Sequence, residues 1–143
     1  MRTIPKEPER RLLGALLRIP YLTIVGRVYQ GLVAAGYDDL RPAHLSVFQH
    51  IRAAGSRSSE LAEEAQMTKQ SMGALIDYLE DRGYVERVPD PLDGRAKIVR
   101  LTARGEGVTR VARTIVLGIE SEWASQLGEE QVRELRQLLE QVA

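Results

Sequence analysis

The fold is decided by the stretch LEDRGYVERVPDPLDGRAKIVRLTARG, which runs from Leu79 to Gly105. Residues that favour strands occupy 84–88 and 96–101 and flank a seven-residue segment with two prolines, two aspartates and one glycine. Such a segment favours turns and discourages strand pairing. The stretch therefore predicts a β-hairpin with a long tip.

Two helices are predicted directly before this hairpin. Ser58 is placed to cap a short helix at 58–65, and Thr68 is placed to cap a longer one at 68–82. Two helices joined by so tight a turn are typical of a helix-turn-helix.

Apolar residues at helical spacing extend the helical pattern to both sides. Pro20 should kink or split the first of these helices, and Thr102 should cap the one after the hairpin. Helices are predicted at 9–35, 42–53, 102–125 and 129–142. The expected fold class is mainly α with a small β-hairpin.

Composition limits the possible functions. A length of 143 residues suits one domain, and 20 Lys and Arg balance 20 Asp and Glu. The absence of Cys excludes disulfides and thiolate chemistry and fits a reducing compartment such as the cytoplasm. Residues 1–11 are charged, and no apolar run approaches the roughly 18 residues of a membrane span, so a soluble protein is expected.

Charge is unevenly distributed along the chain. The segment 87–104 has five Arg or Lys against two Asp, whereas 120–143 has six Glu against two Arg. Any contact with a polyanion must therefore be local and is expected near the hairpin.

The predicted helix at 68–82 has an apolar face and a small, polar face. Its apolar positions are Met72, Leu75, Ile76 and Leu79. The opposite side begins with Lys69, Gln70 and Ser71, which can hydrogen-bond phosphates or base edges in a major groove. Without further context, the same pattern also fits an ordinary solvated face.

The hairpin tip has an equally open interpretation. Arg95 and Lys97 could straddle phosphates and reach into a minor groove, with Asp93 orienting Arg95 through a charge-assisted hydrogen bond. A solvated turn that only reverses the chain is the simpler alternative.

Three parts of the sequence together resemble the winged-helix regulators of the MarR (multiple antibiotic resistance regulator) family. These parts are LEDRGYVER at 79–87, DPLDGR at 90–95 and LTARG at 101–105. The resemblance implies a winged helix-turn-helix with N- and C-terminal dimerisation helices. The whole chain, 1–143, would form one such domain, with dimerisation helices at 9–35 and 107–143 and a DNA-binding lobe at 42–104.

The resemblance also implies a function: a sequence-specific transcriptional regulator that binds a pseudo-palindromic operator as a homodimer. Such regulators are usually repressors and are relieved by a small organic ligand. Helix 68–82 would enter the major groove and Arg95 the minor groove. DNA contacts are then expected from Ser58, Thr68, Lys69, Gln70, Ser71, Gly73, Ala74, Arg95 and Lys97. The chain departs from many relatives at Gly73 and Ala74, where a larger polar or basic residue is usual, so DNA shape should carry more of the recognition.

The family's ligand pocket lies between the dimer helices and the DNA-binding lobe. Residues that could line it here are Tyr29, His44, Phe48 and Arg113. His44 and His50 have no neighbouring Cys or carboxylate cluster, so no metal site and no cofactor are expected. A thiol switch is excluded because the chain has no Cys.

The sequence also bears on two other classes of function. Two isolated histidines without a phosphate-binding glycine loop form no catalytic constellation, so an enzyme is not expected. The alternative that remains open is a winged helix that binds another protein instead of DNA.

Overall fold

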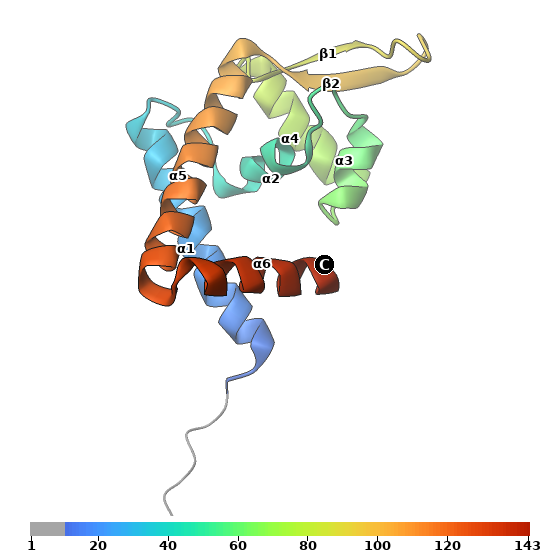
Figure 1. Ribbon diagram of the computed structural model, residues 1–143. Coiled ribbons are helices and arrows are strands. Elements are labelled where there is room, and N and C mark those ends of the chain that lie inside the picture. The colour runs from blue at the N-terminus through green and yellow to red at the C-terminus, as the bar shows by residue number, and fades with distance from the viewer. Residues whose placement is uncertain (1–10) are drawn as a thin grey trace, which may run out of the picture.

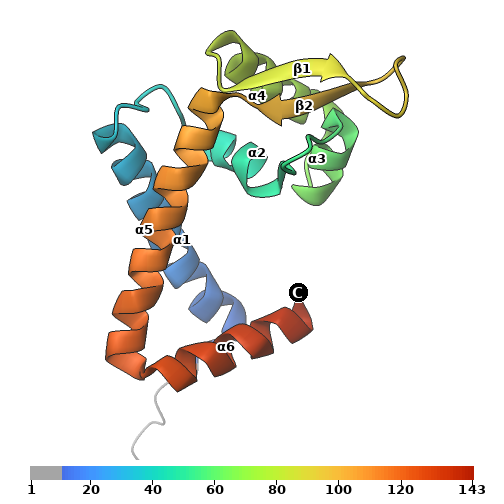
Figure 2. The same cartoon turned by 45° about the horizontal axis from the view of Figure 1, so that its top comes forward.

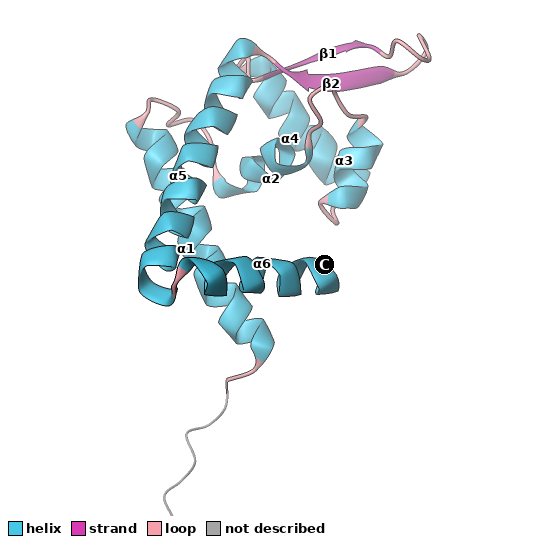
Figure 3. Cartoon of the chain, viewed as in Figure 1, coloured by secondary structure: helices cyan, strands magenta, loops and turns pink. Residues whose placement is uncertain are grey.

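The computed structural model describes residues 11–143 and, within them, is mainly helical with one two-stranded hairpin (Figures 1 and 3). The elements are α1 Leu13–Ala34, the 3-10 helix η1 Pro42–His44, α2 Leu45–His50, α3 Ser58–Glu64, α4 Lys69–Asp81, β1 Val85–Pro89, β2 Lys97–Leu101, α5 Ala103–Leu127 and α6 Glu129–Val142. The predicted order of helices and hairpin is confirmed.

The first helix is continuous. α1 passes through Pro20 without a break, so the predicted split does not occur. Proline removes one helical hydrogen bond and displaces the carbonyl of Leu16, but Leu16 is exposed and water can satisfy that carbonyl. The predicted start at Glu9 lies outside the described residues.

The helix predicted at 42–53 is shorter and begins as a 3-10 turn with Pro42 at its first position. α2 ends at His50 because the chain turns toward the hairpin there. Arg52 donates its backbone N–H to the Ser56 hydroxyl, and Ser56 pairs with Val99 of β2 as an isolated bridge. The sequence pattern does not show this long-range pairing, which is why the predicted end was wrong.

α3 and α4 form the predicted helix-turn-helix. Thr68 caps α4, its Oγ1 accepting the N–H of Ser71 at 3.0 Å, as predicted. The cap predicted at Ser58 is wrong: Arg57 is the N-cap of α3 and contributes no side-chain cap, and Ser58 is already the first helical residue. α4 ends at Asp81, and Gly83, two residues further on, has a φ of 77° that suits glycine.

The hairpin is an antiparallel pair in which Val85 faces Leu101 and Pro89 faces Lys97. Thr102 follows it and caps α5 by accepting the N–H of Gly105, as predicted. A Cβ at Gly105 would lie only 2.1 Å from the Tyr84 carbonyl oxygen, so this crossing of α5 and hairpin requires glycine.

The core lies where α4 packs under the hairpin and against α3, α2 and the ends of α1 and α5. Met72, Ile76 and Leu79 of α4 are buried, which confirms the predicted inner face of that helix, and Leu75 is partly buried. Buried residues from the surrounding elements include Leu32, Leu40, Val47, Leu61, Tyr84, Val99 and Val108.

The outer helices form an arm. α1 packs along α5, and α6 turns off the far end of α5 and runs on the side of α2 and α3 (Figures 1 and 2). α6 has no buried residue, and the Glu120–Arg136 ion pair, at 2.7 Å, links it to α5. The hairpin projects from the opposite end of α5, beyond α4.

Candidate nucleic-acid interface and ligand cavity

The first turn of α4 is exposed to solvent. Lys69, Gln70, Ser71 and Ala74 are exposed, and Gly73 is partly exposed with no neighbouring atom where a Cβ would stand. The inner face of the helix is filled by the core, so its position is fixed. The polar face predicted from the sequence is therefore an accessible one, and its small residues allow close approach by a flat or grooved surface.

The wing, which is the β1–β2 hairpin with its tip, carries two cations that form no ion pair within residues 11–143. These are Arg95 in the tip and Lys97 at the start of β2, and both are exposed. Asp93 accepts a hydrogen bond from the backbone N–H of Arg95 at 3.1 Å. Asp93 therefore restrains the backbone of the turn. It does not make the predicted hydrogen bond to the Arg95 guanidinium.

Other cations of the hairpin region are paired within the chain. Arg87 reaches Asp77 at 2.7 Å and Glu80 at 2.8 Å on α4, and Arg100 reaches Glu86 at 2.6 Å across the hairpin. Of the positive charges in the segment 87–104, those of Arg95 and Lys97 therefore remain available to a partner. The sequence did not predict that Arg87 would link the hairpin to α4, because no local signal identifies its partners.

The link that Asp90 makes to the start of α3 was not predicted from the sequence either. Its carboxylate accepts hydrogen bonds from Arg57, at the start of α3, and from the backbone N–H of Leu92. The hydrogen bond from the Leu92 N–H has the largest effect and the one from the Arg57 guanidinium the next largest, and both lower the pKa of Asp90. The same ion pair raises the pKa of Arg57. The pair joins residues 33 positions apart, which no periodicity could reveal.

A polar cluster fixes the other end of α4. Tyr78 donates its hydroxyl to the Asp39 carbonyl and Tyr84 donates its hydroxyl to the Asp39 carboxylate. Burial, together with the hydrogen bond to Asp39, raises the pKa of Tyr84. The Arg82 guanidinium lies 3.6 Å from the centre of the Tyr78 ring. The C-terminal end of α4 is thereby held to the loop after α1.

His44 belongs to this cluster. Its ring stacks on Tyr78 with centroids 4.3 Å apart, and its Nδ1 accepts the backbone N–H of Arg41 at 2.8 Å. Burial, followed by the charges of Arg82 and Arg41, lowers its pKa. His44 is buried and serves the fold here.

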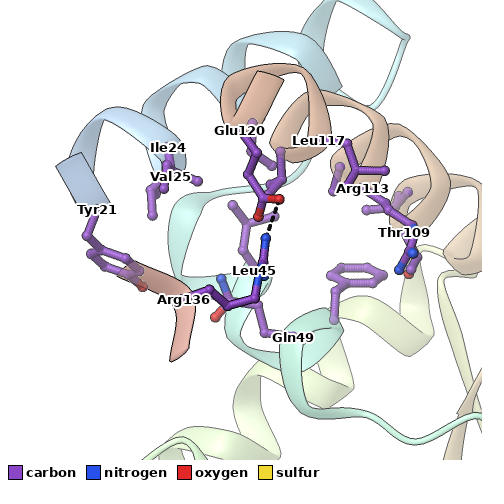
Figure 4. Close-up of a pocket in the computed structure, with 15 residues that line it drawn as sticks. Tyr21, Ile24, Val25, Leu45, Gln49, Thr109, Arg113, Leu117, Glu120 and Arg136 are labelled. Atoms are coloured by element: carbon purple, nitrogen blue, oxygen red, sulfur yellow. Dashed lines mark hydrogen bonds and ion pairs between the residues drawn. The ribbon is translucent and has the colours of Figure 1, made fainter. Parts of the chain in front are cut away.

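A cavity of about 600 Å³ lies between α1, α2 and α5, and Arg136 of α6 also lines it and reaches Glu120 (Figure 4). Of the residues predicted to line such a pocket, Phe48 and Arg113 do so, whereas Tyr29 and His44 do not. Its other polar groups are Tyr21, Gln49, Thr109 and the Glu120–Arg136 ion pair, none of which was predicted from the sequence. The remaining walls are largely aliphatic, from α1 and α5.

Two further observations concern the described part of the chain. Within residues 11–143, no group of three or more His, Asp or Glu side chains is arranged to hold a metal ion. No helix in the same range is both long and apolar enough to cross a membrane.

A helix-turn-helix followed by an anchored β-wing defines the winged-helix class of DNA-binding proteins. A family model described as MarR family matches residues 38–96. The HTH-type transcriptional repressor Rv2887 of Mycobacterium tuberculosis is 31% identical over 121 residues, which cover 82% of this chain and 87% of that protein. The chain belongs to the MarR family.

Solved structures give the same result. Apo MarR from E. coli superposes with a TM-score of 0.72 and 26% identity, covering 94% of this chain and 98% of that one. CouR from Rhodococcus jostii RHA1 bound to p-coumaroyl-CoA gives 0.71 and 26%, covering 91% and 90%. CouR bound to a 23-mer DNA duplex gives 0.71 and 25%, covering 92% of each chain. The protein is a DNA-binding transcriptional regulator of MarR type and not an enzyme.

Proposed function

We propose that the protein is a cytoplasmic repressor that binds a pseudo-palindromic operator as a homodimer and is released from it by a small organic ligand. The observation that carries this proposal is a pair of exposed cations, Arg95 and Lys97, that form no ion pair within residues 11–143 and lie on a wing that the chain fastens to the helix-turn-helix. The similarity to a named repressor and to a DNA-bound relative supports it.

The major-groove contacts fall to the first turn of α4. A major groove about 12 Å wide admits one helix, and Gln70 and Ser71 can hydrogen-bond base edges there. Lys69 suits a phosphate contact, and the α4 N-terminus also favours one. Thr68, Gly73 and Ala74 add close backbone approach rather than charge. Ser58, half-buried at the start of α3, is a weaker candidate for a backbone phosphate contact.

The minor-groove contact falls to Arg95. Arginine is favoured in a narrow minor groove because the potential there is strongly negative. Lys97, on the adjoining strand, is placed to bind the phosphates that border the groove. Because α4 carries few large polar side chains, the width of this groove should contribute much of the sequence preference.

The homodimer is supported by apolar surface that is exposed within residues 11–143. Leu12 and Leu13 at the start of α1 are 81% and 76% exposed, and Val142 at the end of α6 is 80% exposed. Leu16, Leu17 and Leu138 add to the same helices. Surface of this kind marks an interface, and a two-fold pairing of α1 and α6 would bury it in both copies.

The effector site is the cavity between α1, α2 and α5. Its volume lies within the range of about 300–1,000 Å³ that is common for small-molecule sites. Aliphatic walls suit an apolar body, and Arg113 at the rim suits an anionic group. A ligand there would contact both the lobe and the arm, so it can favour one spacing of the two DNA-binding lobes over another.

The test is selection of bound fragments from random duplex DNA at two salt concentrations, followed by sequencing. A repressor of this kind should enrich a near-palindrome whose binding weakens steeply as salt rises. Transcription from a promoter that carries the selected site should fall when the protein is added. Failure to enrich any sequence at low salt would overturn the proposal and favour a winged helix that binds protein.

A further inference from the structure

The residues just before α3 are attached to the wing at two separate points. Midway along the hairpin, Ser56 and Val99 of β2 exchange backbone hydrogen bonds of 2.9 and 2.8 Å. Near the tip, the Arg57 Nε and Nη2 atoms lie 3.2 and 2.8 Å from Oδ2 of Asp90. The helix-turn-helix therefore holds the wing along its length and not only where the hairpin leaves α4.

Asp90 organises the tip as well as anchoring it. Its side chain is only 10% exposed, and its second carboxylate oxygen accepts the N–H of Leu92 at 2.9 Å. Its backbone N–H donates to the Ala96 carbonyl at 2.9 Å, and its carbonyl accepts the N–H of Asp93 at 3.2 Å. One residue thus closes the loop that carries Arg95 and connects this loop to α3.

We infer that Arg57 and Asp90 are positioning residues for DNA binding, which set the distance and angle between the wing's Arg95 and the α4 helix. A two-stranded hairpin alone is a flexible ribbon. Arginine in the minor groove and α4 in the major groove must be held at a fixed separation to engage one operator together. The inference rests on the DNA contact of the wing proposed above.

The competing explanation is that Arg57 itself binds a phosphate, since its side chain is 41% exposed. The two explanations predict opposite signs for Asp90. If Arg57 binds DNA, removing the carboxylate charge frees the arginine and lessens repulsion of the phosphates, so binding should strengthen. If the pair positions the wing, neutralising Asp90 should weaken binding even though a negative charge has been removed.

The experiment measures affinity for the duplex that the wild-type protein selects from random DNA. Asp90→Asn should bind this duplex roughly tenfold more weakly, because a hydrogen-bonded charged pair is broken. Arg57→Ala should lose about as much, and the double variant should lose no more than either single one. Arg52→Ala is the matched control, because Arg52 pairs with Glu60 and Glu64 of α3 and not with the wing. Thermal melting and the mass in solution should match those of the wild type.

A second set of variants tests whether the Arg57–Asp90 pair acts through Arg95. Adding Asp90→Asn to Arg95→Ala should cause no further loss, whereas an independent loss in that background would overturn the inference. Equal or tighter binding by Asp90→Asn alone would overturn it as well. Failure of the proposed function looks different: Arg95→Ala would then leave affinity for the selected duplex unchanged, or no duplex would be selected.

Discussion

The lobe and the arm differ in how completely a single chain buries them. In the lobe, Leu61, Ile76 and Leu79 have no exposed surface, and polar side chains join its elements in pairs. In the arm, α6 has no buried residue and the start of α1 projects leucines into solvent. Both regions have amphipathic helices. Apolar periodicity therefore predicts which face of a helix tends to be buried, but it does not predict whether residues of the same chain or of a second copy pack against that face.

The largest expected effect is on the lobe core. Leu79→Ala should lower the free energy of unfolding by about 2–5 kcal/mol, because it leaves a cavity in a fully packed site. Chemical denaturation measures this change directly. On the arm, Leu138→Ala should instead have an effect that depends on protein concentration, because it acts on the dimer. An equal, concentration-independent loss for both variants would contradict the comparison.

The next effect tests the arm. Leu13→Asp should produce a monomer at micromolar concentration, since an unpaired carboxylate in an apolar interface costs several kcal/mol, roughly 2–7 for a polar group and more for a charge. Analytical ultracentrifugation reports the mass. Leu92→Asp, at a wing-tip leucine that is 95% exposed, places the same charge away from the arm and should remain dimeric. A dimeric Leu13→Asp would move the interface elsewhere.

A smaller effect separates the unpaired cations of the wing from the paired ones. Arg95→Ala should weaken binding to the selected duplex by about 1–3 kcal/mol with no change in melting temperature. Arg100→Ala is the control on the same hairpin, because Arg100 is already paired with Glu86. Fluorescence anisotropy titrations compare them. Equal losses would mean that pairing within the chain does not decide which arginines bind DNA.

The smallest effect concerns pH. Because the pKa of His44 is lowered in the folded protein, the unfolded chain binds protons more readily than the folded one. Stability from the neutral ring is present above the unfolded pKa, about 6.5, and is lost as pH falls from there toward the folded value. Melting between pH 7.5 and 5.5 should show this slope, and His44→Gln should reduce it. An unchanged slope in His44→Gln would assign the dependence to other groups.

Local signals predicted most of the fold. The caps at Thr68 and Thr102 and the terminating Gly83 depend on groups within a few residues, so the sequence indicates them directly. Two of the predictions that were wrong concern Ser58 and the end of the helix at 42–53. In both places the segment between α2 and α3 is drawn into the hairpin by contacts with Val99 and Asp90, which no local rule anticipates.

The candidate site was predicted by residue type but not by arrangement. The outer residues of α4 and the two wing cations are exposed, as an amphipathic helix and a polar tip predict. The roles of Arg87 and Arg57 could not be predicted, since their carboxylate partners are separated from them along the chain. Which two of the four ligand candidates line the cavity was likewise decided by how α1, α2 and α5 cross.

The sequence by itself determined the order of elements, the inner face of α4 and the turn chemistry of the wing, because these follow from periodicity and from groups a few residues apart. Only the tertiary structure decided which charges remain available, where the cavity opens and how the wing is held to α3. Those properties depend on pairs of side chains brought together by packing, and the energy of an ion pair or a contact depends on distance in space, which distance along the chain does not specify.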